Sequence, residues 1–208
     1  IEYAYNLMAS AAGITMSECR LLEENERRHF MTRRFDRLAG GAKLHMQSLC
    51  ALAHFDFNQA GAYSYEQALL TVRQLKLPMA AVEEQFRRMV FNVVARNQDD
   101  HVKNIAFLMN QQGEWSLAPA FDVTYSYNPT GSWTSTHQMT LNGRRDGFTM
   151  EDFEALLNES FELDVPKEGS VVKGTIIAVE AGQAIIDVGF KMEGDKKVRF
   201  SKKSNEVI

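Results

Sequence analysis

Apolar residues in the first half of the chain recur every three or four positions, the spacing of helices with one apolar face. The pattern predicts helices over residues 1–12, 43–53, 64–75 and 78–94. Five apolar residues share one face of the first helix, which ends at Gly13: Ile1, Ala4, Leu7, Met8 and Ala11. The last helix is the strongest, with an apolar stripe from Val82 to Val94, and Pro78 suits its first position. That helix must bury one face, so whatever follows it sits on a rigid element.

Strand-like runs are paired at two places in this part of the chain. Residues 18–24 and 28–35 flank a short polar turn, so we expect a β-hairpin there. Residues 105–110 and 115–119 flank the sequence QQGE and predict a second hairpin. The second hairpin leads directly into the sequence AFDV.

The character of the chain changes after about residue 150. A helix is predicted over residues 150–161, with Thr149 and Asp152 as its start signal. From Gly169 the pattern turns to runs rich in Val and Ile, and about three strands can be read. We therefore expect three parts: residues 1–152, a helix and linker over residues 153–168, and a β segment over residues 169–208.

Composition narrows the class of protein. The 208 residues are 45% hydrophobic, with a net charge of −4 and a pI near 5.8, which fits a packed globular protein without a global cationic field. The sequence contains no run of about 18 apolar residues, which is the length that would predict a membrane span. Cys19 and Cys50 form no C-x-x-C pair, which is typical of a reducing compartment, so we expect a cytoplasmic protein. The chain begins with Ile1 rather than methionine, which suggests that its beginning is missing.

A polar cluster, ARNQDDHVKNIAFL, follows the strongest helix. Asp99 and Asn104 have the spacing D-x-x-x-x-N of a protein-kinase catalytic loop, in which the aspartate takes the proton of the substrate hydroxyl and the asparagine holds magnesium. Asp100 is one residue out of that register. Asp122, just past the second hairpin, is the candidate for a second magnesium ligand, because the hairpin carries the chain out and returns it beside the loop.

The same residues have simpler interpretations. A polar loop with capping side chains would also contain Asp99 and Asn104, since the spacing occurs often by chance. For His101 the alternative is a hydrogen-bonding loop residue, and for Lys103 a solvated charge.

Several sequence blocks, in order, resemble the HipA-like serine/threonine kinases of bacterial toxin–antitoxin systems over about residues 1–152. The blocks are HFMTRRFDR, KLHMQSLCALAHFDF, FRRMVFNVVARNQDDHVKNIAFL, LAPAFDVTYSYNP and HQMTLNGRRDGFT. The resemblance implies ATP and Mg²⁺ as cofactors, a protein substrate with a Ser/Thr acceptor, and a DNA-binding antitoxin as a partner. It also implies an α+β fold, with a mostly α-helical protein-kinase-like lower lobe, a remnant of the upper-lobe sheet and a β-hairpin.

The resemblance also assigns roles to residues. Asp99 resembles the catalytic base, Asn104 and Asp122 resemble the metal ligands, and His101 would lie near the nucleotide phosphates. The backbone from Arg33 to Phe35 resembles the hinge between the two kinase lobes, which binds adenine, and Asp36 would lie close to the ribose. For Phe35, a core aromatic is the alternative.

One feature of the family does not appear in this sequence. A glycine-rich phosphate loop of the type G-x-G-x-x-G is not found, and Gly40 and Gly41 lie on the wrong side of the hinge. The loop and the lysine that accompanies it stabilise charge in the transition state. We therefore expect the chain as given to be inactive or nearly so.

Residues 153–194 resemble the start of bacterial ribosomal protein S-one, with the first strands of an OB-fold repeat. The resemblance implies an incomplete OB-fold-like segment, since that fold has five strands. Phe190, Lys191 and Phe200 stand among basic residues that could follow an RNA backbone, so RNA or the ribosome is a possible partner. A solvated chain end is the alternative. Two unrelated families would then meet near Glu151, as in a fusion of fragments from gene rearrangement or sequence assembly.

Overall fold

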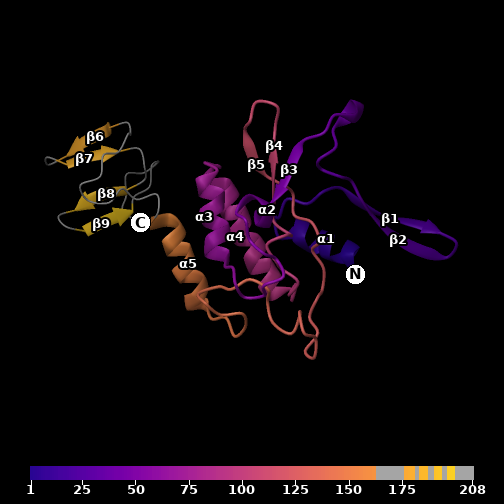
Figure 1. The fold of residues 1–208 in the computed structure, drawn as a ribbon. Helices are drawn as coiled ribbons and strands as arrows, with labels where there is room; N and C mark the ends of the chain where they lie inside the picture. The colour runs from indigo at the N-terminus through magenta and orange to yellow at the C-terminus, as the bar shows by residue number, and fades with distance from the viewer. Residues whose placement is uncertain (163–175, 181–182, 187–189, 194–195, 200–208) are drawn as a thin grey trace. The chain divides into compact units, whose positions relative to one another are not determined.

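The computed structural model describes residues 1–162, 176–180, 183–186, 190–193 and 196–199, with side chains described as far as residue 158. The chain forms two compact units, Ile1–Ser160 and Phe161–Ile208 (Figure 1). The first unit combines helices with two small sheets, and the strands described in the second unit form one sheet. Both units therefore contain short sheets, and the helices belong mainly to the first unit.

The helices of the first unit have the following bounds: α1 Glu2–Ala11, α2 Leu49–Leu52, α3 Tyr65–Gln74, α4 Met79–Val94 and α5 Met150–Glu162, with a short 3-10 turn at Ala39–Gly41. Helix α3 begins with a capping box in which Ser64 and Gln67 satisfy each other's backbone N–H groups. Helices α3 and α4 pack together, and the main core forms between them and strand β4 (Figure 1). Its largest fully buried side chains include Tyr65 and Phe107.

Two small antiparallel sheets complete the first unit. Strands β1 (Cys19–Glu24) and β2 (Arg27–Thr32) form the first predicted hairpin, which extends away from the helices (Figure 1). Strands β3 (His45–Ser48), β4 (Ala106–Met109) and β5 (Trp115–Leu117) form the other sheet in the order β3-β4-β5, and β4 with β5 is the second predicted hairpin. Both hairpin predictions are therefore confirmed.

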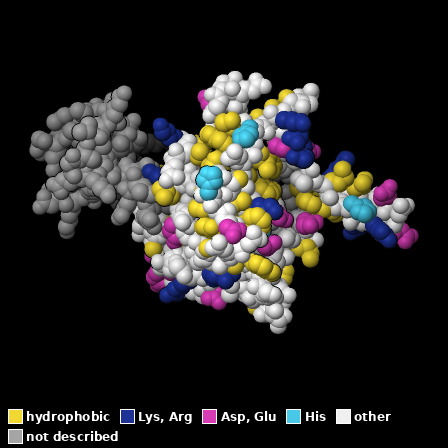
Figure 2. All heavy atoms as spheres, in the orientation of Figure 1, with side chains coloured by type: hydrophobic (Ala, Val, Ile, Leu, Met, Phe, Trp, Pro, Cys, Tyr) yellow, Lys and Arg dark blue, Asp and Glu magenta, His cyan; other side chains and the backbone are white. Residues whose placement is uncertain are grey.

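The projecting hairpin carries apolar side chains on its surface. Leu21, Leu22 and Met31 are exposed by about two fifths of their area. The space-filling view shows hydrophobic side chains on the hairpin beside basic, acidic and histidine side chains (Figure 2). The turn between the strands places Asn25 and Glu26 at φ values of 52° and 61°. Two consecutive residues with positive φ are what a tight hairpin turn requires.

Three details of the helices differ from the sequence predictions. Residues 43–53 were predicted to be helical, but His45–Ser48 form strand β3 and only Leu49–Leu52 form a helix, because β4 offers its open edge to this segment. Pro78 is the N-cap of α4 rather than its first residue. The apolar face of α1 is exposed, with Leu7 52% and Met8 48% accessible.

Helix α1 instead packs through a different side. Asn6 and Ala9 are its buried residues. Ala9 packs with Ile14 and Ala120, and the Asn6 side chain donates to the carbonyl of Ser17. The hydrogen bond and the small buried alanine bring the helix close to the segment that precedes β1, which explains why its larger apolar residues face outward.

The second unit contains four described strands in the order of the chain: β6 (Ile176–Glu180), β7 (Gln183–Ile186), β8 (Phe190–Glu193) and β9 (Lys196–Arg199). All neighbours are antiparallel. This is one strand more than the three read from the sequence, because residues 196–199 add a partner to β8. Phe190 and Lys191 lie on β8, whereas Phe200 and the predicted linker over residues 163–168 lie outside the described residues.

Helix α5 begins as the sequence predicted. The Asp152 carboxylate accepts hydrogen bonds from the backbone N–H of Thr149 at 2.9 Å and from its hydroxyl at 3.2 Å. Among the described residues, no helix combines the length and apolar content needed to cross a bilayer.

Candidate active site

The predicted catalytic loop connects the end of α4 to the start of β4. Both of its neighbours are core elements, and the loop is also tied to the short helix α2. The backbone N–H of Leu49 donates to Ile105 at 2.7 Å and that of Cys50 donates to Val102 at 3.2 Å. The loop is therefore held at several points by backbone hydrogen bonds before any side chain is considered.

Asp100 is the buried anchor of this loop. Its carboxylate accepts three hydrogen bonds: from the hydroxyl of Tyr65 at 2.5 Å, from the backbone N–H of Gln138 at 2.7 Å, and at 2.8 Å from Nδ1 of His137. Asp100 is only 3% exposed. Burial, followed by the negative charge of Asp100, raises the pKa of the Tyr65 hydroxyl well above its usual value, so Tyr65 stays a donor.

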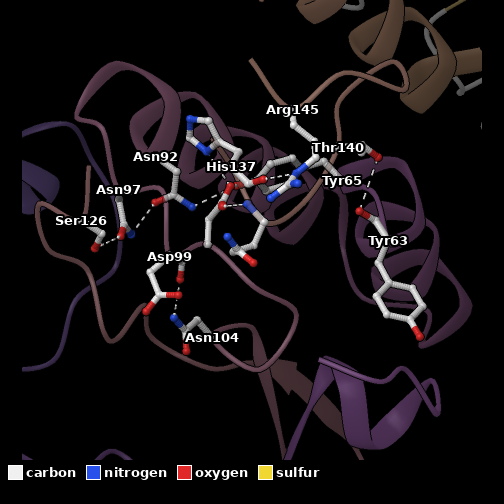
Figure 3. A network of polar contacts seen from close by, with 12 residues as sticks. Tyr63, Tyr65, Asn92, Asn97, Asp99, Asn104, Ser126, His137, Thr140 and Arg145 are labelled. Atoms are coloured by element: carbon white, nitrogen blue, oxygen red, sulfur yellow. Dashed lines mark hydrogen bonds and ion pairs between the residues drawn. The ribbon is translucent and has the colours of Figure 1, made fainter. Parts of the chain in front are cut away.

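A chain of polar contacts extends from this anchor toward the segment after Asp122 (Figure 3). The Asn92 amide nitrogen donates to the Tyr65 hydroxyl at 3.1 Å, and the Asn97 amide nitrogen donates to Asn92 Oδ1 at 3.0 Å. The Ser126 hydroxyl lies 3.3 Å from Asn97 Oδ1. The network therefore joins α3, α4, the loop and the segment around Ser126.

Asp99 points away from this network. Its side chain is 47% exposed, in contrast to the buried Asp100 beside it. The Asn104 amide nitrogen donates to the backbone carbonyl of Asp99 at 2.9 Å, which closes the loop between these two residues (Figure 3). Nε2 of His101 lies 3.6 Å from Oδ1 of Asp99. The loop thus presents an accessible carboxylate with an imidazole and an amide beside it.

Asp122 occupies a strained backbone position on the neighbouring segment. Its φ is 56°, in the left-handed region that residues other than glycine rarely adopt. The preceding Ala120 is fixed by a hydrogen bond from its N–H to the carbonyl of Thr15 at 2.8 Å and by a parallel bridge to Met16. Strain of this kind persists where the surroundings impose it, and it is common at functional sites.

Two neighbouring hollows collect most of the predicted site residues. A pocket of about 400 Å³ is lined by Arg33, Phe35, Asp36 and Asp122, together with residues of α1 and the β1–β2 hairpin. A smaller cavity of about 30 Å³ is lined by His101 and Asn104, together with Asp100. The two hollows share three wall residues: Ala120, Phe121 and Val123. Asp99 is not among the residues that line either hollow.

The predicted hinge is held by an arginine pair that the sequence analysis did not assign. Arg34 donates to both carboxylate oxygens of Asp36, at 2.9 and 2.7 Å, and Arg37 also donates to this carboxylate. The hydrogen bonds from Arg34 hold the pKa of Asp36 below its usual value. The ring of Phe35 lies 5.7 Å from that of Phe121, so this residue packs against the segment that carries Asp122 while also lining the pocket.

The structure adds four residues to the site beyond those predicted. Tyr65, His137 and Asp100 form the buried anchor, and Arg34 binds Asp36. In the sequence, the pair Asp99–Asp100 and the segment RRFDR indicate these parts of the site. Neither pattern shows which side chain points into the protein.

Comparisons with known proteins identify the family. The model of the HipA-like C-terminal domain matches residues 1–182, so the chain belongs to this family. A solved HipA chain from Shewanella oneidensis, in a complex described as HipA, HipB and operator DNA, is 17% identical with a TM-score of 0.66. The similarity covers 76% of this chain and 42% of that one, and at this identity it shows the fold alone.

Short matches to ribosomal proteins accompany the family match. Small ribosomal subunit protein bS1 of Rhodopseudomonas palustris is 47% identical over 51 residues, which is 24% of this chain and 9% of that protein. The same protein of Rhizobium meliloti is 52% identical over 46 residues, 22% of this chain and 8% of that protein. This chain therefore spans less than a tenth of these curated relatives and under half of the HipA chain.

Proposed function

We propose that residues 1–152 are a fragment of a HipA-like toxin kinase that binds ATP with Mg²⁺, and that they serve phosphoryl transfer to a serine or threonine of a protein substrate only together with a glycine-rich phosphate loop and its lysine. The observation that carries this proposal is the pocket of about 400 Å³, in which the predicted hinge residues and Asp122 line one space although they are some 90 positions apart in sequence. The adjoining cavity holds His101 and Asn104.

The larger pocket suits a nucleotide with its base near the hinge. The backbone from Arg33 to Phe35 would contact adenine, and the Phe35 side chain supplies apolar surface. Asp36 forms ion pairs with Arg34 and Arg37, so it would hold the hinge backbone in place as well as lie close to the ribose. Such a mixture of apolar walls and a few fixed polar groups is typical of small-molecule sites.

The donor set suits magnesium rather than a self-contained metal cage. In the part of the chain that the structure describes, no three His, Cys, Asp or Glu side chains gather to hold a metal. Mg²⁺ commonly uses one or two protein oxygens together with substrate phosphates and water. Asn104 and Asp122 would supply those oxygens, and the bound ion would neutralise charge on the phosphates.

Asp99 would act on the acceptor. The oxygen of the substrate hydroxyl forms a bond to the γ-phosphorus, and the bond between that phosphorus and the ADP oxygen breaks. The accessible carboxylate of Asp99 takes the proton that the hydroxyl loses. Because Asp99 lines neither hollow, its position fits contact with a protein substrate at the surface rather than with the nucleotide. The buried bonds of Asp100 would keep this part of the loop in place.

Binding of a non-hydrolysable ATP analogue, measured calorimetrically with Mg²⁺ and with EDTA, tests this proposal. We expect Mg²⁺-dependent binding that Asp122→Asn weakens by about tenfold or more, equivalent to about 1.4 kcal/mol. Asp146→Asn is the matched control, since Asp146 is an exposed aspartate that lines neither hollow. Binding that ignores both Mg²⁺ and Asp122 would contradict the proposal.

We also propose a DNA-binding antitoxin as the partner of this chain. The supporting observation is the solved HipA relative, whose complex contains HipB and operator DNA. Co-purification of the chain with the protein of a neighbouring gene, followed by a DNA-binding assay of the pair, tests the partnership.

A second candidate function, binding to RNA or the ribosome, is favoured by the short bS1 matches. Phe190 and Lys191 of β8 would contact the RNA. For single strands, each phosphate contact contributes about −0.7 to the slope of log K against log salt. We expect Lys191→Ala to make this slope shallower by about that amount. An RNA affinity that does not change with salt would exclude this function.

A further inference from the structure

The cavity of about 30 Å³ behind the catalytic loop has a polar wall, and the proposed function does not use the side of it that helix α4 forms. Helix α4 contributes Gln85 and Arg88 to this wall, and the loop contributes His101 and Asn104. Gln85 is 1% exposed and Arg88 is 8% exposed, so two polar residues occupy the buried side of α4, where apolar residues would be expected.

Two atoms in this wall are buried polar groups without a hydrogen-bond partner among the described residues: Oε1 of Gln85 and Nδ1 of His101. Buried polar atoms in proteins are nearly always paired with protein or with ordered water. The two residues that carry these atoms line one space, and about 10–15 Å³ is enough to hold a water molecule.

We propose that this cavity is a binding site for an ordered water molecule that donates one hydrogen bond to Gln85 Oε1 and one to His101 Nδ1. An amide oxygen is an acceptor, and Nδ1 is an acceptor when the imidazole proton is on Nε2, so the ligand needs two donors. Hard cations bind oxygen ligands, and an imidazole nitrogen is not one of them, so a water molecule matches this pair of acceptors better than a cation does.

The proton belongs on Nε2 because of what that nitrogen faces. Nε2 of His101 lies 3.6 Å from Oδ1 of Asp99, which is beyond hydrogen-bond distance, but a carboxylate only accepts and therefore favours a proton on the nitrogen that faces it. The water donates to Nδ1 and therefore stabilises the same tautomer, in which the Nε2–H points toward Asp99. Gln85, through this water, is a positioning residue for His101. The site stands whether or not the chain is a kinase.

The test is nuclear magnetic resonance of the full chain labelled with ¹⁵N-histidine, in mildly alkaline buffer where imidazoles are neutral. Long-range correlations of the His101 ring report its tautomer, and cross-relaxation with solvent reports a long-lived water beside it. We expect the Nε2–H tautomer and a water-to-ring cross peak in the natural sequence. Gln85→Met should lose the cross peak, whereas Gln85→Glu, which keeps an acceptor, should retain it.

Gln98→Met is the matched control. Gln98 is also buried, at 8% exposure, and its Oε1 also lacks a partner among the described residues, but it does not line the cavity. This variant should keep the tautomer and the water signal. If Gln85→Met fails to fold, the signals of the natural sequence and of Gln85→Glu still decide. An Nδ1–H tautomer in the natural sequence, no bound water beside His101, or a direct contact between Gln85 and His101 would overturn the proposal.

Discussion

Replacing Asp100 tests whether the loop is held by its buried carboxylate. Asp100→Asn keeps the shape of the side chain but removes the charge and places an N–H₂ group among three donors. These donors are Tyr65 Oη, His137 Nδ1 and the backbone N–H of Gln138. At least one of them must lose its partner. A buried donor left unsatisfied costs about 1–3 kcal/mol, and the cost is greater where the lost partner was a charged group.

We therefore expect Asp100→Asn to lower the free energy of unfolding by about 2–4 kcal/mol. Urea denaturation followed by tryptophan fluorescence measures this loss, because both tryptophans, Trp115 and Trp133, belong to the first unit. Tyr65→Phe removes one donor to Asp100 and the acceptor of the Asn92 amide but leaves the buried carboxylate with two donors, so it should cost less, about 1–2 kcal/mol.

The neighbouring aspartate is the control. Asp99 has the same chemistry but is 47% exposed, and exposed substitutions usually change stability by less than about 0.5 kcal/mol. Equal unfolding free energies for Asp100→Asn and Asp99→Asn would refute the anchoring role of Asp100. A destabilised Asp99→Asn with an unaffected Asp100→Asn would reverse the assignment of the two residues.

Three further predictions concern activity, acid stability and the division of the chain. In a kinase-competent protein, Asp99→Asn should abolish phosphate transfer and leave ATP-analogue binding intact, as radiolabel and calorimetry would show. Hydrogen bonds from the Thr149 backbone and the Asn142 amide lower the pKa of Asp152, so its stabilisation is present above about pH 4 and is lost as pH falls through the lowered value. Urea midpoints should therefore fall less between pH 7 and pH 3 for Asp152→Asn than for the natural sequence. Limited proteolysis with mass spectrometry should show the first cuts within residues 162–208, whose described strands form one short sheet, and an initial loss of residues 1–150 would contradict this.

The fold was predictable where the periodicity was local. Helices α3 and α4 and both hairpins follow from spacing and turn residues within a few positions of each other. Strand β3 was not predictable in this way, because its partner β4 lies about 60 residues away and its apolar spacing also fits a helix. The exposure of the apolar face of α1 could not be predicted for a similar reason. The packing of this helix depends on contacts of Asn6 and Ala9 with other segments of the chain.

For the candidate site, the sequence motif indicates a loop but not the direction in which its side chains point. Asp99 and Asp100 are chemically identical neighbours, and only the positions of Tyr65 and His137 make one of them buried. The roles of Asp99, Asn104 and Asp122 remain predictions.

The wall shared by the two hollows has a thermodynamic consequence. Ala120, Phe121 and Val123 face both the larger pocket and the cavity beside His101. A molecule that shifts Phe121 from one side would change the space on the other, so we expect the occupancies of the two hollows to be energetically linked. Linkage is reciprocal: whatever factor a ligand in the larger pocket applies to binding in the cavity, the cavity's occupant applies to that ligand. The three-residue wall would then couple the nucleotide pocket to the water site behind the catalytic loop.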